Sequence, residues 1–349
     1  MLEQLRQKLA QLELDGIWIA KPENIRYLSG FTAPKDAKLL VTQSIVRLYT
    51  DARYTAQAKL ESVVPVEIAR FEEVYSHAKQ FTEHKKIGFE ADAVLYSSYE
   101  ELANQLGATL HSVMDIIEPL RALKNPSEIE HIRRAAQIAD AALSAILPKL
   151  QAGISERDLA LELEFEMRRR GADAAAFDIV VASGQRSAMP HGVASQRVLE
   201  SGDLVTIDWG AVQNGYHSDC TRAYPIGEIS SQLKQMYNAV LAANLLAISH
   251  VKAGVGCKAL DTIARDYLKE QGFDKEFAHS LGHGVGLAIH EAPTLSQRAD
   301  DDALLKAGMI VTIEPGVYLE GVGGVRIEDL LLVTDTGCEI LTGLPKPPL

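Results

Sequence analysis

Hydrophobic positions change their spacing along the chain, and the change divides it into two halves. In the first half, Leu2, Leu5, Leu9 and Leu12 recur at helical spacing, and a short apolar run follows at 16–20. Further strand patterns cover 37–50, as a pair, and 86–90, and a helical pattern covers 97–106. Alternation of short helices and strands predicts an α/β layer domain. No glycine-rich phosphate loop follows these strands, so this half shows no nucleotide-binding motif.

A boundary falls near RALKNPSEIE at 121–130. There Asn125 can cap a helix, Pro126 suits its first position and Glu128 can complete a capping box. We expect helices from here to about Leu150, from Ser155 to Arg170, and at 231–252 and 258–271, with strands around 177–183, 203–212, 216–225, 309–319 and 325–334. The pattern therefore predicts two domains, 1–122 and 123–349, of which the second is a strand-rich α+β domain.

Composition and charge exclude several classes of protein. Of the 349 residues, 47% are apolar and 23% charged, which is enough apolar material for a large core. The net charge of −12 argues against a nucleic-acid partner. The N-terminus has no signal-peptide pattern, and the apolar stretch Val240–Val251 is too short and too interrupted to span a membrane. With three scattered cysteines that we interpret as reduced thiols, we expect a cytoplasmic protein.

The first candidate site surrounds a predicted hairpin turn at Asn214-Gly215. A two-residue loop there places position 208 opposite 221, so Asp219 lies diagonally from Asp208 on the same face. Diagonal neighbours lie about 7–8 Å apart, within reach of one shared cation. Two solvated surface aspartates are the alternative, but Asp208 follows apolar Ile207 in a strand that looks buried, where an unpaired carboxylate is costly.

A second pair of acidic residues is symmetric about Gly321. A hairpin centred there places Glu314 directly opposite Glu328 on one face. Two like charges in that position destabilise a sheet unless a cation lies between them. The alternative is that Arg326 and the loop satisfy the two carboxylates separately.

Histidines gather in a glycine-containing segment at 277–293, which contributes His279, His283 and His290. A single histidine is usually structural, but the glycines at 282, 284 and 286 indicate backbone packed closely around a site. The segment is not an HExxH zinc motif, because position 294 is Thr. A further candidate, His191, lies in a loop, where most histidines are simply exposed to solvent.

Together these candidates form an oxygen-rich ligand set of two Asp, two Glu and one His. Hard or borderline divalent ions such as Mn²⁺ suit it, and four carboxylates can hold a pair of ions whose charge they balance. A two-metal site can hold a bridging hydroxide at neutral pH and polarise a carbonyl. The ligand set therefore predicts metal-dependent hydrolysis of an amide or ester.

The motifs around these residues resemble those of a known family. PHG at 190–192, GHGVGLAIHE at 282–291, EPGVY at 314–318 and GVRIED at 324–329 resemble the pita-bread metallopeptidases. The N-terminal motifs NIRYLSGF and TDARYTAQA, and the linker RALKNPSEIEHIRRAA, are similar to the proline-specific branch, aminopeptidase P and prolidase. The resemblance covers nearly the whole chain. It implies a creatinase-like α/β N-terminal domain and an α+β pita-bread catalytic domain.

The resemblance also implies roles for the candidate residues. Two divalent ions are expected, Mn²⁺ first and Co²⁺ or Zn²⁺ otherwise, with Asp208 chelating one ion and His283 completing the shell of the other. Asp219 and Glu328 would bridge them. Glu314 would be a metal ligand that also handles the proton of the attacking hydroxide. His191 and His290 would contact substrate and stabilise the tetrahedral intermediate, and His279 would line the site. Arg326 would orient an acidic ligand. A homodimer is implied as well.

Within this branch the N-terminal motifs favour aminopeptidase P, which removes the first residue from Xaa-Pro-Yaa peptides. Prolidase, which cleaves Xaa-Pro dipeptides, stays open, because Lys35 and Lys38 in FTAPKDAK could bind the free carboxylate of a dipeptide. Methionine aminopeptidase would not need the N-terminal domain. A non-catalytic binding module, or a creatinase-type hydrolase that works without metal, would not need all five ligands.

Overall fold

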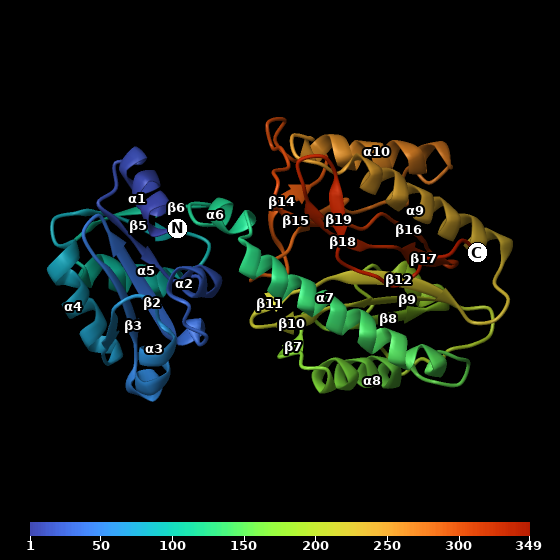
Figure 1. Ribbon diagram of the computed structural model, residues 1–349, viewed down its shortest axis with the longest axis horizontal. Coiled ribbons are helices and arrows are strands. Elements are labelled where there is room, and N and C mark those ends of the chain that lie inside the picture. The colour runs from blue at the N-terminus through green and yellow to red at the C-terminus, as the bar shows by residue number, and fades with distance from the viewer. The chain divides into compact units, whose positions relative to one another are not determined.

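The computed structural model describes residues 1–349, apart from the side chain of Phe71. The chain forms two compact units, Met1–Arg121 and Ala122–Leu349. Figure 1 shows the elements of both units. Among the described helices, none combines the length and the apolar character that a bilayer crossing requires.

The first unit is built on a mixed six-stranded sheet in the order β4-β3-β2-β1-β5-β6. Strand β1 pairs antiparallel with β2 and parallel with β5. The strands are β1 (Gly16–Ile19), β2 (Ala37–Thr42), β3 (Val46–Thr50), β4 (Val66–Ile68), β5 (Lys86–Glu90) and β6 (Thr109–Val113). The helices are α1 (Leu2–Gln11), α2 (Pro22–Ser29), α3 (Thr55–Glu61), α4 (Phe71–Thr82), α5 (Tyr96–Gln105) and α6 (Glu118–Ala122), the last of which ends one residue into the second unit. The α/β layers expected from the pattern are present.

Alternation along the central strands sends side chains to two cores. Ile17 and Ile19 of β1 pack in one cluster with residues of α1 and α2, such as Leu5 and Leu28. Trp18 points to the opposite face and packs with residues of α4 and α5. Both faces of the sheet are therefore covered by helices, which is why its central strands are apolar throughout.

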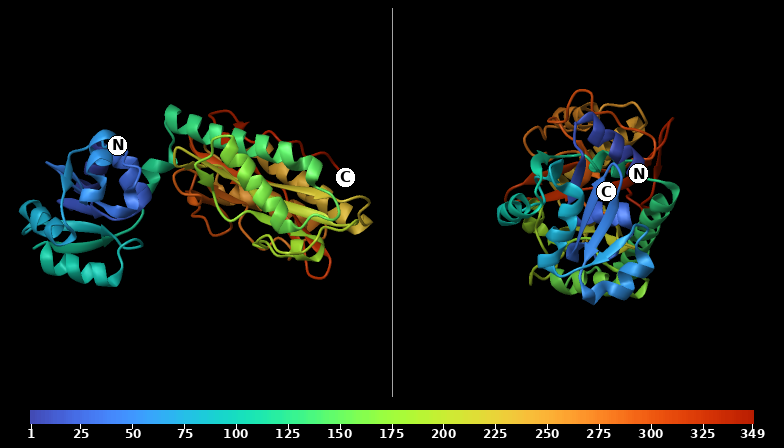
Figure 2. Two further views of the ribbon diagram at one scale, coloured as in Figure 1. Left: turned by 90° about the horizontal axis from the view of Figure 1, so that it is seen from below. Right: turned by 90° about the vertical axis from the view of Figure 1, so that its left-hand side faces the viewer.

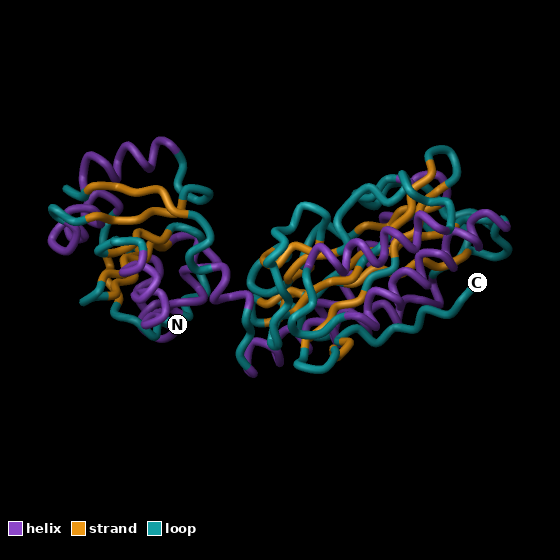
Figure 3. The backbone as a smooth tube through the Cα atoms, turned by 90° about the horizontal axis from the view of Figure 1, so that it is seen from above, coloured by secondary structure: helices purple, strands orange, loops and turns teal.

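The second unit places strands between two helix pairs, α7 with α8 and α9 with α10 (Figures 1 and 3). In the left view of Figure 2, α7 runs lengthwise across the strands of this unit. The helices are α7 (Pro126–Ile146), α8 (Glu156–Arg169), α9 (Ser231–His250) and α10 (Cys257–Glu270), all close to their predicted bounds. As predicted, α7 begins with a capping box, in which Asn125 accepts from the backbone of Ser127 and Glu128.

The strands of the second unit form four small sheets, β11-β10-β7, β12-β9-β8, β14-β13-β15-β18-β19 and β16-β17. Their bounds are β7 (Ala174–Ala175), β8 (Val180–Ser183), β9 (Leu204–Trp209), β10 (Ala211–Gln213), β11 (Tyr216–His217), β12 (Cys220–Pro225), β13 (Gly282–Gly284), β14 (Glu291–Leu295), β15 (Ile310–Ile313), β16 (Gly316–Leu319), β17 (Gly323–Arg326), β18 (Asp329–Val333) and β19 (Cys338–Ile340). One core joins α7 and α8 to β8, β9 and β12, and a second joins α9 and α10 to β15, β17 and β18. The strands that carry the candidate ligands thus lie between two packed helical layers.

Both predicted hairpin registers are present. Asn214 and Gly215 have positive φ values of 47° and 73° and connect β10 to β11, as a two-residue turn with right-handed strand twist requires. Asp208 of β9 pairs with Thr221 of β12.

In the second hairpin, the pairs Ile313–Asp329 and Gly316–Arg326 bracket Glu314 and Glu328. This is the register that symmetry about Gly321 predicts. The charged positions are therefore set by local turn geometry.

One acidic side chain of α7 lies away from the candidate site. Asp140 accepts the Gly343 backbone N–H through Oδ2 at 2.5 Å, while its Oδ1 is buried and has no hydrogen-bond partner among the described residues. Burial raises the pKa of this carboxyl to about 6. The folded protein therefore holds a proton on Asp140 more tightly than the unfolded chain does.

We expect Asp140→Asn to weaken the pH dependence of stability. Because the pKa of Asp140 is raised in the folded protein, its contribution to the free energy of unfolding is complete below about pH 4. That contribution is lost as the pH rises through about 6. Between pH 5 and pH 8, the free energy of unfolding of the variant should therefore rise by about 1–3 kcal/mol relative to that of the parent. Urea unfolding at both pH values measures this, with exposed Asp335→Asn as the control. Parallel stability curves for parent and variant would contradict it.

Candidate functional site

A pocket of about 540 Å³ opens in the second unit. It brings together every site residue that the sequence predicted: His191, Asp208, Asp219, His279, His283, His290, Glu314, Arg326 and Glu328. These residues come from the four candidate segments of the sequence, so the folded unit alone makes the segments neighbours.

Three of these side chains form a compact cluster in the pocket. Ligand atoms of Asp219, His283 and Glu328 all lie within 4.8 Å of one another. His283 Nε2 lies 3.6 Å from Asp219 Oδ2 and 3.3 Å from Glu314 Oε1. One metal ion could contact atoms of this group simultaneously.

The ring orientation of His283 favours a cation at this point. Its Nδ1 lies 3.0 Å from the carbonyl oxygen of Gly284, an acceptor, so Nδ1 carries the hydrogen and donates it. Burial lowers the pKa of His283 and keeps the ring neutral. Its Nε2 then presents a lone pair toward two carboxylates, and a lone pair facing carboxylates is repulsive unless a cation lies between them.

Two buried oxygen atoms point to the same conclusion. Asp208 Oδ1 and Glu328 Oε1 are buried and have no hydrogen-bond partner among the described residues. The other oxygen of each carboxylate is engaged, because Arg326 Nη2 donates to Asp208 Oδ2 at 2.6 Å and Thr221 Oγ1 donates to Glu328 Oε2 at 2.7 Å. A buried oxygen left without a donor is costly, and a divalent ion would remove that cost. The residues therefore fit a divalent-metal site.

Electrostatic repulsion among the carboxylates is large in the absence of a cation. Burial raises the pKa of Asp219, and neighbouring Glu328 and Asp208 raise it further. Burial likewise raises the pKa of Glu328, and Glu314 and Asp208 add to that rise. Arg326 is the guanidinium that opposes this charge, and it is itself 4% exposed.

Glycines allow the backbone to pack closely behind the ligands. A Cβ at Gly282 would lie 2.1 Å from the carbonyl oxygen of Thr312, and one at Gly284 would lie 2.2 Å from that of Ala292. Both contacts are impossible for any other residue, so the glycines bring β13, which carries His283, against β14 and β15. This is the close packing that the spacing of glycines predicted.

Several contributing residues were not predicted from the sequence. Thr221 accepts from Arg326 Nε at 3.1 Å and so links the guanidinium to Glu328. Thr312 donates to Glu314 Oε1 at 3.1 Å and accepts the His283 backbone N–H. Tyr318 accepts from Arg326 Nη1 at 2.8 Å and lies 3.0 Å from His279 Nε2. Thr221 pairs with the predicted ligand Asp208, and Thr312 lies two residues before Glu314, so their positions beside predicted ligands are the signal that could have identified these two. Tyr318 has no such signal, because it pairs with Gly324.

Three histidines border the charged cluster. The His290 ring lies edge-on to His283, with centroids 4.4 Å apart, and both His290 and His191 line the pocket and are exposed. His279 is more enclosed, and burial lowers its pKa and that of His290. An imidazole N–H that lines this pocket could donate a hydrogen bond to a bound carbonyl.

Comparison with known proteins agrees with this fold and site. The model of Metallopeptidase family M24 matches residues 130–335, and the Creatinase/Prolidase N-terminal domain matches 1–123. A Xaa-Pro dipeptidase of Pyrococcus furiosus is 41% identical over 98% of this chain and 97% of its own. A solved Xaa-Pro dipeptidase from Bacillus anthracis has a TM-score of 0.95 at 42% identity, covering 99% of this chain and 98% of that one.

A solved X-Pro aminopeptidase from Thermotoga maritima is also similar, with a TM-score of 0.90 at 37% identity over 99% of this chain and 98% of that one. These matches confirm the creatinase-like and pita-bread architecture expected from the motifs. The chain therefore belongs to the M24 metallopeptidases and carries the N-terminal domain of the creatinase and prolidase group.

Proposed function

We propose that this protein hydrolyses the peptide bond of Xaa-Pro dipeptides with the help of divalent metal ions. The observation that carries the proposal is the cluster of Asp219, His283 and Glu328, whose neutral imidazole and unpartnered carboxylate oxygen converge on one point. The same pocket is lined by the exposed His191 and His290, which a substrate entering it could contact. The two relatives named as Xaa-Pro dipeptidases support this choice of substrate.

Five side chains would hold two ions: Asp208, Asp219, His283, Glu314 and Glu328. Bound there, the ions would lower the pKa of a water molecule and polarise the scissile carbonyl. We propose Mn²⁺ as the physiological ion, with Co²⁺ or Zn²⁺ as substitutes, because carboxylate-rich sites suit it.

Proton transfer falls to Glu314 in this proposal. Its carboxyl lies beside the cluster that would hold the metal ions, with Oε1 3.3 Å from His283 Nε2, which is the reach that a general base for a metal-bound water requires. The Thr312 hydroxyl holds Oε1 in place, so the carboxylate keeps one orientation while it takes a proton from the attacking water. His191 and His290 donate hydrogen bonds to the oxygen of the tetrahedral intermediate. His279 lines the pocket, and Arg326 orients Asp208.

Aminopeptidase P activity is the second candidate. It is the specificity that the N-terminal motifs favoured, and the similarity to the Thermotoga maritima aminopeptidase supports it. The dipeptidase relatives, at 41% and 42% identity, give the prolidase alternative the better support. Three further expectations belong to the proposal: a homodimer, a cytoplasmic location, and a functional boundary between residues 122 and 123.

The loop that carries His191 is held by a buried glutamate. Glu156 is fully buried at the start of α8 and accepts from the backbone N–H of Ser183 at 2.8 Å and of Ser195 at 3.0 Å, and also from both serine hydroxyls. Arg186, inside the same loop, forms an ion pair with it. Because these contacts lie on both sides of His191, we propose Glu156 as the residue that positions the loop.

We expect Mn²⁺ restored to metal-stripped protein to recover cleavage of Xaa-Pro dipeptides more than of Xaa-Pro-Yaa tripeptides. Release of the first residue from a matched pair, Ala-Pro and Ala-Pro-Ala, measures the preference. Faster cleavage of the tripeptide would assign aminopeptidase P instead. Cleavage of neither, with metal bound, would remove proline specificity from the proposal.

We expect Asp219→Ala and Glu328→Ala to lose bound metal and activity together, because each removes a proposed shared ligand. His191→Ala should lose turnover and keep its metal. Elemental analysis of the dialysed proteins, paired with initial rates, separates the two outcomes. Normal metal content in both carboxylate variants would overturn the ligand assignment, and metal loss in the histidine variant would overturn its substrate role.

We expect Glu156→Gln to lower kcat by about tenfold or more, because His191 loses its fixed position, while metal content is unchanged. The amide must face at least one donor with its own N–H groups, so the free energy of unfolding should fall by about 1–3 kcal/mol. Glu164→Gln on the same helix, in a partly exposed ion pair with Arg168, is the matched control. A fall in stability with unchanged kcat would leave Glu156 a purely structural role.

A further inference from the structure

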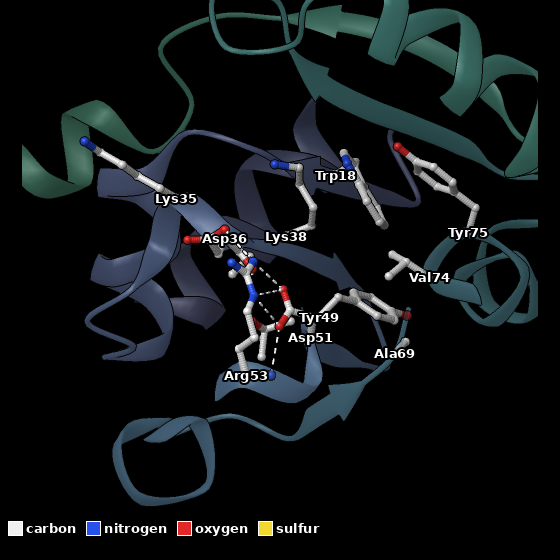
Figure 4. A pocket seen from close by; sticks show the side chains of 12 residues that line it. Trp18, Lys35, Asp36, Lys38, Tyr49, Asp51, Arg53, Ala69, Val74 and Tyr75 are labelled. Carbon is white, nitrogen blue, oxygen red and sulfur yellow. Dashed lines mark hydrogen bonds and ion pairs between the residues drawn. The ribbon is translucent and has the colours of Figure 1, made fainter. Parts of the chain in front are cut away.

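The first unit contains a cavity of its own, with a volume of about 330 Å³. Figure 4 shows aromatic side chains from three elements around it, Trp18 of β1, Tyr49 of β3 and Tyr75 of α4. Ala69 and Val74 complete the apolar wall. The volume is in the range of small-molecule sites and suits a ligand the size of one amino acid.

The aromatic walls present carbon surface to this cavity. The Trp18 ring lies 5.8 Å from the Tyr49 ring and 5.7 Å from the Tyr75 ring, centroid to centroid. Both tyrosine hydroxyls have partners, since Tyr49 lies 3.2 Å from His77 Nδ1 and Tyr75 donates to Glu101. The walls therefore favour an apolar or aromatic group.

Lys38 breaks the apolar pattern of strand β2 at this cavity. Its neighbours on the strand, Ala37 and Leu39, point to one core, and Leu40 points to the other and is fully buried there. Lys38 occupies the same face as Leu40, where an apolar side chain would extend the core. Instead its half-buried ammonium borders the cavity beside Trp18 (Figure 4).

The ammonium of Lys38 has no anionic partner within ion-pair distance among the described residues. The two carboxylates that line the cavity, Asp36 and Asp51, are both bound by Arg53, at 3.0 Å and 2.7 Å. Glu90, the other nearby carboxylate, accepts from the backbone of Ala20 and Lys21. Burial without a partner lowers the pKa of Lys38, so a bound anion would relieve a desolvation cost.

We propose that this cavity is a second ligand site, which binds a small organic carboxylate bearing an aromatic or branched apolar group. The carboxylate lies on Lys38 Nζ, and the apolar group lies between Trp18, Tyr49 and Tyr75. Lys35 also lines the cavity but is exposed, so the half-buried Lys38 is the cation that gains most from a bound anion. A half-buried cation beside an aromatic cavity gives the class of ligand, since the cation and the cavity each satisfy a different part of the same molecule. This site lies in the first unit and shares no residue with the proposed peptidase site.

The tryptophans of this protein offer a direct test. The chain has two, and the other, Trp209, is fully buried in the second unit, where its indole donates to the carbonyl of Ala139 at 2.9 Å. Indole N–H signals of ¹⁵N-labelled full-length protein, assigned with Trp209→Phe, are followed during titration with 3-phenylpropionate. We expect a saturable shift of the Trp18 signal and a constant Trp209 signal.

The neutral amide, 3-phenylpropionamide, should bind roughly tenfold more weakly, because it lacks the charge that Lys38 recognises. Lys38→Met should weaken binding of the acid to the level of the amide. Lys59→Met, which removes an exposed lysine of α3, should leave acid binding unchanged. Val74→Phe, which fills the cavity without touching Lys38, should abolish binding of both probes.

Three results would overturn the proposal: no saturable Trp18 shift with the acid, equal affinity for acid and amide, or unchanged acid affinity in Lys38→Met. The Trp209 signal reports the folded state of the second unit in each variant, and the circular dichroism of the full chain reports the first. Loss of binding with an intact spectrum is therefore distinguishable from loss of folding. A shift of Trp209 alone would place the probe in the catalytic unit instead.

Discussion

Repulsion among four carboxylates is the constraint on which the catalytic unit depends. Asp208, Asp219, Glu314 and Glu328 line one pocket, and two of them are almost fully buried. In low dielectric such charges cannot all remain ionised without compensation. One fixed cation, Arg326, provides part of it, and the remaining negative charge is what selects divalent ions for the site. The need to balance this negative charge therefore explains why Arg326 lies beside the four carboxylates and why the pocket suits divalent ions.

The surrounding hydrogen bonds keep the carboxylates apart and in one orientation. Thr221 holds Glu328, Thr312 holds Glu314, and Arg326 holds Asp208. Each of these bonds uses one oxygen of a carboxylate and leaves the other for a ligand. A hydroxyl suits this task, because it stabilises the ionised form and adds no charge. The carboxylates therefore repel one another strongly, and their hydrogen bonds leave the side chains little freedom to reduce that repulsion by rotating.

Much of the site could be predicted because the ligands lie at positions that local turns determine. Asn214-Gly215 and Gly321 set two hairpin registers, and these registers place Asp208, Asp219, Glu314 and Glu328 on shared faces. The contacts of Glu156 and Tyr318 could not be predicted in the same way, because they join segments that meet only in the folded unit. Strand β13 has too many glycines for an alternating pattern, so His283 was identified by its motif and not by its secondary structure.

The choice between a dipeptide and a longer substrate could not be made from the ligands alone. It depends on the walls of the pocket beyond the ligands, and the motifs near the N-terminus favoured aminopeptidase P, whereas the named relatives favour prolidase. Lys38 shows how far the sequence reaches. Its charge in an otherwise apolar strand can be recognised from the sequence, but the surroundings of the charge cannot. Only the packing of Trp18, Tyr49 and Tyr75 around it shows that the lysine borders a cavity of the first unit.

The hairpin origin of the ligands has a consequence for how the catalytic unit folds. Asp208 and Asp219 are joined by one short turn, but more than a hundred residues of sequence separate them from Glu328, including both α9 and α10. Closing a loop of that length costs chain entropy that local contacts cannot offset. An ion held by both hairpins would therefore act as a long-range cross-link, joining segments that the chain alone leaves far apart in sequence.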